Sequence, residues 1–184
     1  MIGSHRLIPA ITAPRIKRAV KALARAISKD YLGKEPVVVC ILKGSFIFCA
    51  DLIREITIPV KIDFIGMKSY GAATRSSGVV HVTKDLEVDI RGKDVIVVED
   101  IVDTGGTMKH ILNLLKEKRP ATVKVCALVD KRKTWVRPSV DYLGFRQGRA
   151  FLVGYGLDIG ERYRQLKGLY RIGEGRKPSL RKIG

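Results

Sequence analysis

The sequence predicts an α/β fold in which helices flank a parallel β-sheet. The run Val95–Val98 is β-branched with no polar alternation, which is typical of a strand buried on both faces of a parallel sheet. Val37–Leu42 is expected to be a second buried strand. Helical patterns alternate with the strands, and parallel strands joined in this way form right-handed crossovers. We therefore expect helices on both faces and a ligand site outside the carboxyl ends of the strands.

Two helices are expected in the first third of the chain. Thr12 with Pro14 is a helix-start signal, and this helix is expected to end near Asp30. Phe46–Ile56 predicts a second, mostly buried helix. The first helix has one apolar stripe, formed by Ile16, Ala19, Val20, Leu23, Ala24 and Ile27.

The remaining segments complete a single domain. Val60–Ile65, Thr122–Val129 and Tyr142–Phe145 are expected strands. Ala72–Gly78 is rich in small residues without periodicity, which predicts a long mobile loop. Gly173–Gly184 is basic and contains Gly and Pro, so partial disorder is expected there. No repeat or linker divides the 184 residues.

The composition, with 46% hydrophobic and 29% charged residues, is that of a soluble globular protein. No apolar run approaches the roughly 20 residues that a membrane span needs. The first residues also lack the apolar stretch of a secretory signal. Cys40, Cys49 and Cys126 lie in apolar runs without CxxC spacing, which predicts buried free thiols. Together these features predict a cytoplasmic protein without membrane contact.

The net charge of +17 is unusually high. Clustered basic residues can neutralise nucleic-acid phosphates. No aromatic-interleaved platform accompanies the charge, so a solvated basic surface is favoured and a nucleic-acid partner is not expected. Much of the charge falls late in the chain, at Arg162, Arg164, Lys167, Arg171, Arg176, Lys177, Arg181 and Lys182.

The most informative segment follows the strand Val95–Val98. A Thr-Gly-Gly-Thr turn at 104–107 leads into an amphipathic helix whose apolar face carries Met108, Ile111, Leu112 and Leu115. A strand, a glycine turn and a helix in this order direct backbone N–H groups at a ligand above the sheet edge. Helix N-termini favour anions, so a phosphate is the expected ligand.

Three carboxylates, Glu99, Asp100 and Asp103, lie directly before this turn. Carboxylates beside a phosphate are expected where they hold sugar hydroxyls, a divalent cation or a proton in transit. The ligand should therefore carry a phosphate, a ribose and a metal. An ordinary β–α turn with solvated acids, or Asp103 as a helix N-cap, is the simpler interpretation of the single residues.

This segment resembles the PRPP motif of type I phosphoribosyltransferases, where PRPP is 5-phosphoribosyl 1-pyrophosphate. Other segments resemble the family in the same order, and together they cover most of positions 36–166. The combination is similar to the 6-oxopurine branch. Leu42–Gly44 resembles the pyrophosphate loop, Asp63–Tyr70 the strand into a mobile loop, Val123–Arg132 the purine-recognising strand, and Asp141–Phe145 with Phe151–Asp158 the purine-stacking segment and its metal aspartate.

The resemblance implies a fold with a small hood built from the N- and C-terminal segments. It also implies purine salvage, in which the 5-phosphoribosyl group passes from Mg²⁺-bound PRPP to hypoxanthine or guanine, giving IMP or GMP plus pyrophosphate. Members of the family commonly pair, so a homo-oligomer is expected.

The resemblance assigns most of the phosphate-binding residues. It makes Asp103 the general base or acid at N7 of the purine. Glu99 and Asp100 are implied to bind ribose hydroxyls, directly or through Mg²⁺. Asp158 is implied to help hold a second Mg²⁺. The 5′-phosphate is assigned to Thr104, Gly105, Gly106 and Thr107, and the pyrophosphate to Leu42, Lys43, Gly44 and Arg164; in the family the loop peptide here can be non-proline cis.

The purine contacts rest on the resemblance as well. Lys131 is implied to donate to the purine O6, and an ammonium donor selects an exocyclic carbonyl over the amino group of adenine. Phe151 is implied to stack on the base and the Leu152 backbone to contact its edge. Ser69 and Tyr70 are implied to lie in a loop that closes over the site and excludes water.

Two departures from the family pattern limit these assignments. Gly106 occupies a position that often carries a side chain, and Ile159-Gly160 follows Asp158 where a bulkier, more polar pair is common. Two alternatives stay open: a phosphoribosyltransferase that prefers xanthine, and an RNA-binding, nucleotide-sensing regulator on the same fold. The set Asp103, Lys43 and Asp158 favours an active enzyme over the regulator.

Overall fold

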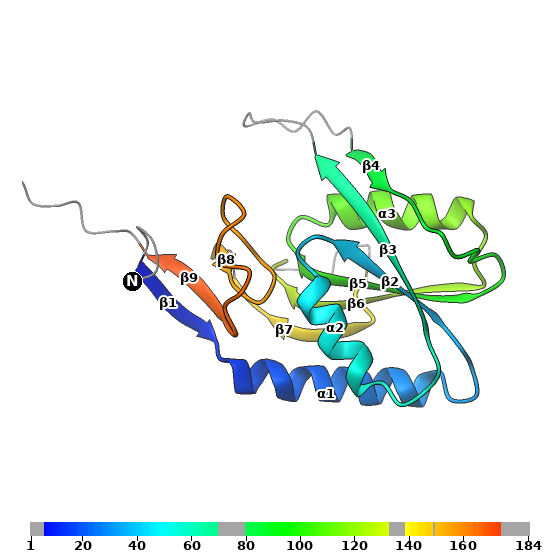
Figure 1. Cartoon of the computed structure of the whole chain (residues 1–184), viewed down its shortest axis with the longest axis horizontal. Coiled ribbons are helices and arrows are strands. Elements are labelled where there is room, and N and C mark those ends of the chain that lie inside the picture. The colour runs from blue at the N-terminus through cyan, green and yellow to red at the C-terminus, as the bar shows by residue number, and fades with distance from the viewer. Residues whose placement is uncertain (1–5, 70–79, 133–138, 149, 174–184) are drawn as a thin grey trace, which may run out of the picture.

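The computed structural model describes residues 6–69, 80–132, 139–148 and 150–173. Its main element is a six-stranded sheet in the order β4-β3-β2-β5-β6-β7 (Figure 1). All neighbouring strands are parallel except β4, which pairs antiparallel with β3 at one edge. The predicted parallel sheet is therefore confirmed, with β4 as an addition. The strands are β2 (Val37–Leu42), β3 (Lys61–Ser69), β4 (Val80–Lys84), β5 (Asp94–Val102), β6 (Thr122–Asp130) and β7 (Tyr142–Arg146).

Helices cover both faces of this sheet, as expected. Helices α1 (Ala13–Asp30) and α2 (Phe46–Glu55) pack with Val38 and Cys40 of β2. Helix α3 (Gly106–Glu117) packs on the opposite face. Successive residues of a strand point to opposite faces, so β2 and β5 are buried on both sides. Burying one such aliphatic side chain contributes about 1.5–3 kcal/mol, which fixes the central strands and the loops at their ends.

The elements begin and end close to the predicted residues. Thr12 is the N-cap residue of α1 and Pro14 lies in its first turn. The predicted stripe of α1 is buried except at Ala19, which is half-buried. Strand β5 is longer than the apolar run indicates and includes Glu99 and Asp100. It extends because its parallel pairing with β6 continues to Val102 and Asp130, so backbone hydrogen bonding holds the charged residues in the strand.

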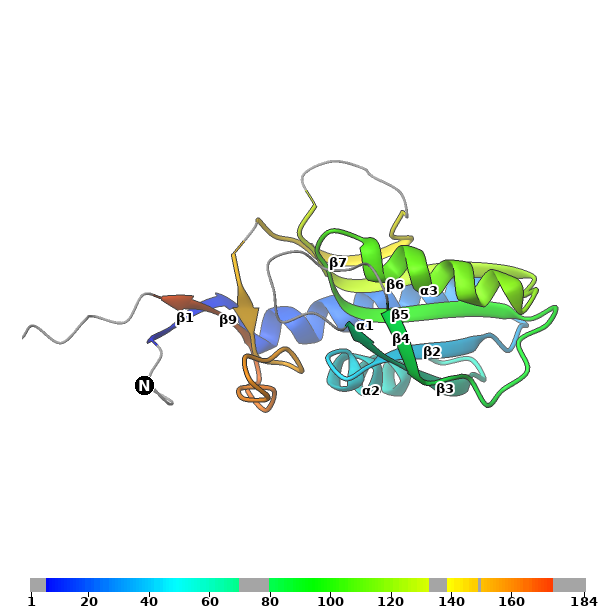
Figure 2. The same ribbon diagram turned by 90° about the horizontal axis from the view of Figure 1, so that it is seen from above.

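A second, three-stranded antiparallel sheet joins the two ends of the described chain. Its order is β1-β9-β8, with β1 (Arg6–Ile11), β9 (Leu169–Gly173) and β8 (Leu152–Val153). Figure 2 shows β1 and β9 at one end of the molecule, beyond the main sheet. This sheet is the hood that the family resemblance implies. The loop between β8 and β9 reaches back from it toward the main sheet.

Some expectations concern residues outside the described ranges. The predicted mobile loop at Ala72–Gly78 and the tail after Gly173 both lie there, and Gly173 itself ends β9. Cys40, Cys49 and Cys126 are buried free cysteines, as predicted. None of the helices in the described ranges combines the length and apolar character that crossing a bilayer requires.

Candidate active site

The predicted site residues gather at the carboxyl ends of β2, β5 and β6. A cavity of about 320 Å³ lies there between the end of β2 and the start of α3. Because parallel strands end at the same edge, residues far apart in sequence share this cavity. It is lined by Ile41, Leu42, Met67, Glu99, Ile101, Val102, Asp103, Thr104, Gly105, Thr107 and Met108.

The turn from β5 into α3 forms a cradle of backbone N–H groups. Gly105 is the N-cap residue of α3 and has φ +86°, a left-handed conformation that glycine adopts without strain. The N–H groups of the first helical turn have no partner within the helix and favour an anion. The Thr104 hydroxyl accepts a bond from Gly106 N at 3.4 Å. Asp103 is not the N-cap, so the simpler interpretation of that residue was wrong.

The departure at Gly106 has little steric consequence. A Cβ built on Gly106 would meet only Thr104 Oγ1, at 3.6 Å, which is an ordinary contact. The cradle therefore has room for at least a Cβ at this position.

Glu99 and Asp100 form a partly buried acidic pair at the end of β5. Asp100 is buried and accepts a bond from Ile101 N at 2.8 Å, while Glu99 is half-buried and lines the cavity. Burial, followed by repulsion from Asp100, raises the pKa of Glu99 well above its ordinary value. Burial also raises the pKa of Asp100, although hydrogen bonding to Glu99 opposes this. A cation or a ribose hydroxyl at this pair would relieve the repulsion.

Asp103 and Lys131 face each other across the cavity edge. Lys131 Nζ donates to Asp103 Oδ2 at 3.1 Å. The Lys131 side chain is 8% exposed and the Asp103 side chain 62% exposed. The adjacent pair Asp130 and Arg132 anchors this end of β6, with Arg132 donating to both carboxylate oxygens of Asp130. Asp103 thus reaches solvent while Lys131 is fixed behind it.

The loop after β2 runs against the acidic pair. The Leu42–Lys43 peptide is cis, as the family resemblance allows. A Cβ on Gly44 would lie 1.9 Å from Asp100 Oδ2, so any larger residue would force the buried Asp100 carboxylate or the loop to shift. Gly156, with φ +101°, approaches the same loop from the hood side, and a Cβ there would lie 2.0 Å from the Gly44 carbonyl oxygen. The loop is thus held between Asp100 of β5 and Gly156 after β8, and both contacts are too close for a side chain at the glycine.

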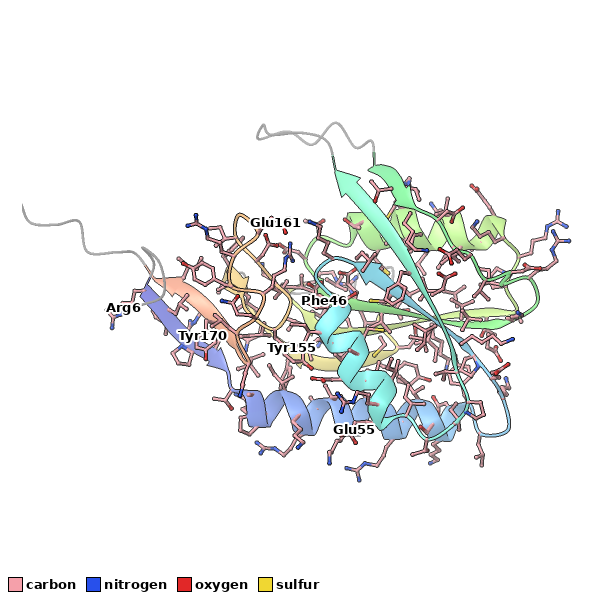
Figure 3. The ribbon with its side chains drawn as sticks, viewed as in Figure 1. Arg6, Phe46, Glu55, Tyr155, Glu161 and Tyr170 are labelled. Carbon is pink, nitrogen blue, oxygen red and sulfur yellow. The ribbon has the colours of Figure 1, made fainter. Side chains whose placement is uncertain are left out.

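Arg164 and Asp158 come together on the loop between β8 and β9. Arg164 Nη1 donates to the Gly156 carbonyl at 2.7 Å, and Nη2 lies 2.9 Å from Asp158 Oδ1. Arg164 also bonds Glu161 at 3.1 Å, and Glu161 bonds Lys43 at 3.2 Å. Figure 3 places Glu161 on this loop, on the side that faces the start of α2 at Phe46. Hydrogen bonds from Lys43 and then Arg164 lower the pKa of Glu161.

The remaining predicted residues are less closely tied to the cavity. Phe151 is 54% exposed and precedes β8, while Leu152 is buried and pairs with Arg171. Ser69 ends β3, but its side chain and Tyr70 fall outside the described part of the chain. The sequence reasoning missed Glu161. The i,i+3 spacing of Glu161 and Arg164 was a weak local signal of an ion pair. The contact of Glu161 with Lys43 spans 118 residues, and no local sequence pattern indicates it.

Comparisons with known proteins show the family to which this chain belongs. The family model of the phosphoribosyl transferase domain matches residues 9–159. The chain is 46% identical over 159 residues to the hypoxanthine-guanine phosphoribosyltransferase of Aquifex aeolicus, covering 85% of this chain and 89% of that protein. It is 44% identical to that of Dictyostelium discoideum, covering 89% and 93%. A crystal structure of the Bacillus anthracis enzyme aligns with a TM-score of 0.84 at 43% identity, covering 90% and 98%.

Proposed function

The chain belongs to the phosphoribosyltransferase family, and we propose that it transfers the 5-phosphoribosyl group of PRPP to hypoxanthine or guanine. The products are IMP or GMP and pyrophosphate, which makes the reaction one of purine salvage. The observation that carries the proposal is the cavity that Glu99, Asp103 and the cradle residues Thr104, Gly105 and Thr107 line together. These are the groups that a ribose 5-phosphate with a reacting C1′ requires.

The cradle and the acidic pair hold the sugar phosphate in this proposal. The 5′-phosphate accepts bonds from the N–H groups at the start of α3 and from the hydroxyls of the turn, at Thr104, Gly105, Gly106 and Thr107. Glu99 and Asp100 bind the ribose hydroxyls, directly or through a metal ion. Burial raises the pKa values of both carboxyls, and repulsion between them raises that of Glu99 further, so the pair favours hydroxyl donors and cations over a second phosphate.

Asp103 and Lys131 act on the base. As the bond from N9 to C1′ forms and the bond from C1′ to the pyrophosphate oxygen breaks, the proton on N7 passes to the Asp103 carboxylate. Lys131 donates to O6, which favours hypoxanthine and guanine over adenine. Phe151 stacks on the ring and the Leu152 backbone contacts its edge. The exposed ring of Phe151 is available for this contact.

The leaving pyrophosphate is held by Leu42, Lys43 and Gly44 together with Arg164. Backbone N–H groups and two cations suit a polyanion. The contact of Gly44 with Gly156 supports a common site, because it brings the loop after β2 and the Arg164 loop together. Ser69 and Tyr70 are assigned to the covering loop that keeps water from the reacting C1′.

Mg²⁺ fits the donor chemistry of this site. Among the described residues, no three His, Cys, Asp or Glu side chains form a ready-made metal group. Magnesium is commonly held by one or two carboxylates together with substrate oxygens. We assign one ion to Glu99 and Asp100 and a second to Asp158. When bound, the metal neutralises charge on the diphosphate.

The protein is further proposed to be a cytoplasmic homo-oligomer. Phe46, Ile62 and Phe64 are exposed apolar side chains on α2 and β3, and a second copy would bury them. Analytical ultracentrifugation tests this point, and a monomer at all concentrations would contradict it.

A base panel tests the proposed activity. Purified protein with PRPP and Mg²⁺ is assayed with hypoxanthine, guanine, xanthine, adenine and uracil. We expect turnover with hypoxanthine and guanine, with adenine at least about 100-fold slower because it lacks the acceptor for Lys131. Xanthine turnover above that of hypoxanthine would favour the xanthine alternative. Comparable turnover of adenine would overturn the role of Lys131.

A further inference from the structure

Glu161 joins the two cations that the proposed function assigns to pyrophosphate. Its Oε1 lies 3.2 Å from Lys43 Nζ, and its Oε2 lies 3.1 Å from Arg164 Nη2. The two carboxylate oxygens thus divide between two positive groups from different parts of the fold. Lys43 follows β2, whereas Arg164 lies on the loop between β8 and β9. One carboxylate therefore bridges both sides of the proposed diphosphate site.

The bridge is held in a specific backbone conformation. Glu161 has φ +62°, a left-handed conformation that is unfavourable for a non-glycine residue. Its N–H donates to Asp158 Oδ2 at 2.8 Å, which fixes the turn. Tyr163, with φ +77°, is 3% exposed and anchors the chain beyond it. The loop is thereby shaped so that the Glu161 side chain reaches Lys43.

The Glu161 carboxylate can nevertheless leave its partners readily. Its side chain is 65% exposed, and the Lys43 side chain is 64% exposed. The pair of Glu161 with Lys43 contributes little to stability at such exposure, because water and salt compete for both groups. The Arg164 side chain is 18% exposed and also pairs with Asp158, so Glu161 is one of two carboxylates at Arg164. A diphosphate carries several negative charges and can replace a single carboxylate at Lys43 and Arg164.

We propose that Glu161 is an internal counter-anion, and this inference rests on the proposed function. In the free protein its carboxylate pairs with Lys43 and Arg164, and the diphosphate of the ligand displaces it from them. The carboxylate keeps Lys43 and Arg164 positioned before the ligand arrives. It also competes with the ligand, so it lowers the affinity for PRPP and pyrophosphate. When pyrophosphate leaves, Glu161 returns to the same cations and favours its release.

The experiment compares ligands that use different parts of the site. Dissociation constants of inorganic pyrophosphate, PRPP and ribose 5-phosphate are measured by calorimetry at fixed Mg²⁺ for the wild type and Glu161→Gln. We expect pyrophosphate and PRPP to bind about 2- to 10-fold more tightly to the variant, since the exposed pair with Lys43 and the partly buried pair with Arg164 no longer have to be broken. Ribose 5-phosphate, which uses the cradle, should change less than about 2-fold.

Matched variants separate displacement from a general change in charge. Glu117→Gln removes one exposed carboxylate at the far end of α3 and should leave all three constants unchanged. In a Lys43→Gln background, the gain from Glu161→Gln should shrink, because one of the broken pairs is already absent. An equal gain in both backgrounds would mean that Glu161 acts only through long-range charge, and the proposal would be wrong.

The remaining outcomes are also decisive. Weaker pyrophosphate binding by Glu161→Gln would mean that Glu161 organises the site and does not compete with the ligand, which overturns the proposal. Unchanged binding would overturn it as well, while leaving the proposed function intact if the wild type binds pyrophosphate and turns over hypoxanthine. If the wild type binds neither pyrophosphate nor PRPP, the proposed function itself fails.

Discussion

In the proposed function, the cradle at 104–107 and the loop at 156–164 bind phosphate by opposite means. The cradle uses backbone N–H groups at the start of α3, which are fixed by the helix and need no countercharge. The loop uses the Arg164 guanidinium, which is already paired with the carboxylates of Asp158 and Glu161. The cradle is therefore ready for its phosphate, whereas Arg164 would have to exchange a carboxylate for the diphosphate when the ligand binds.

This difference predicts how each half responds to substitution. The exposed pair of Lys43 with Glu161 is worth about 0–1 kcal/mol, so exchanging that partner costs little and single changes there should shift affinity modestly. In the proposed function, no other group replaces the proton acceptor Asp103, and the close packing at Gly44 leaves little space for a larger residue. Substitutions there should cause the larger losses, and the following predictions test this order.

Asp103→Asn should have the largest effect. The amide preserves the shape of the side chain but cannot accept the N7 proton, so we expect kcat to fall about 100- to 10,000-fold. The dissociation constant of PRPP should change little, because the cradle is intact. Steady-state rates with hypoxanthine and calorimetry with PRPP measure both quantities. Asp89→Asn, an exposed carboxylate that accepts a bond from Arg91 N, is the control. Unchanged kcat would place the proton elsewhere.

Lys131→Met should come next. It removes the donor to O6 and the ion pair with Asp103, while retaining the length of the buried stem. We expect kcat/KM for hypoxanthine to fall about 10- to 100-fold, since a hydrogen bond from a charged group is lost. The ratio of kcat/KM for hypoxanthine to that for adenine should fall. The base panel repeated on this variant provides the measurement, with the exposed Lys29→Met as control. An unchanged ratio of hypoxanthine to adenine would contradict the assignment of Lys131.

Gly44→Ala tests the close packing beneath the pyrophosphate site. The new Cβ would collide with the Asp100 carboxylate, so the loop after β2 must move. Overpacking costs typically 1–3 kcal/mol, and we expect KM for PRPP to rise about 10-fold. Gly148→Ala is a suitable control because a Cβ there meets no atom within 4 Å. If KM for PRPP stays the same in Gly44→Ala, the loop does not contact the diphosphate.

The smallest effect concerns the scaffold and depends on pH. Asp63 on β3 accepts bonds from Phe64, Glu87 and Val88 N–H groups. Burial raises the pKa of Asp63, but these bonds outweigh it and the net pKa lies below the ordinary 3.8. The resulting stability is complete above 3.8 and is lost as the pH falls through the lowered pKa.

Urea unfolding measures this contribution. At neutral pH, Asp63→Asn should lower the free energy of unfolding by about 1–2 kcal/mol relative to the wild type. The difference should narrow as the pH is lowered below 3.8, because the wild-type carboxyl then takes up a proton. A difference that is independent of pH would show that the ionised carboxylate is not the stabilising form.

Local patterns predicted the main sheet and the cradle. The apolar runs of β2 and β5 and the periodicity of α3 are contained within single segments, so the sequence displays them directly. The hood sheet has no such pattern, because β8 has only two residues and β1 pairs with β9 across almost the whole chain. Its presence was implied by resemblance alone.

The pairings within the site could not be predicted for a related reason. Lys131 meets Asp103 across 28 residues, and Glu161 meets Lys43 across 118. The spacing of these residues in the sequence does not predict such contacts, because the contacts depend on which strands become neighbours in the sheets. The acid-rich end of β5 shows the same limit: pairing with β6, not local preference, keeps Glu99 and Asp100 in the strand.

The contact between Gly156 and Gly44 couples two parts of the protein mechanically. Because both residues are glycines, the backbone of one loop contacts the backbone of the other directly. We therefore expect a shift of the Lys43 peptide to displace the turn that carries Glu161. A fluorescent label on the outer rim of that turn would act as a sensor of diphosphate occupancy, although it would never touch the ligand.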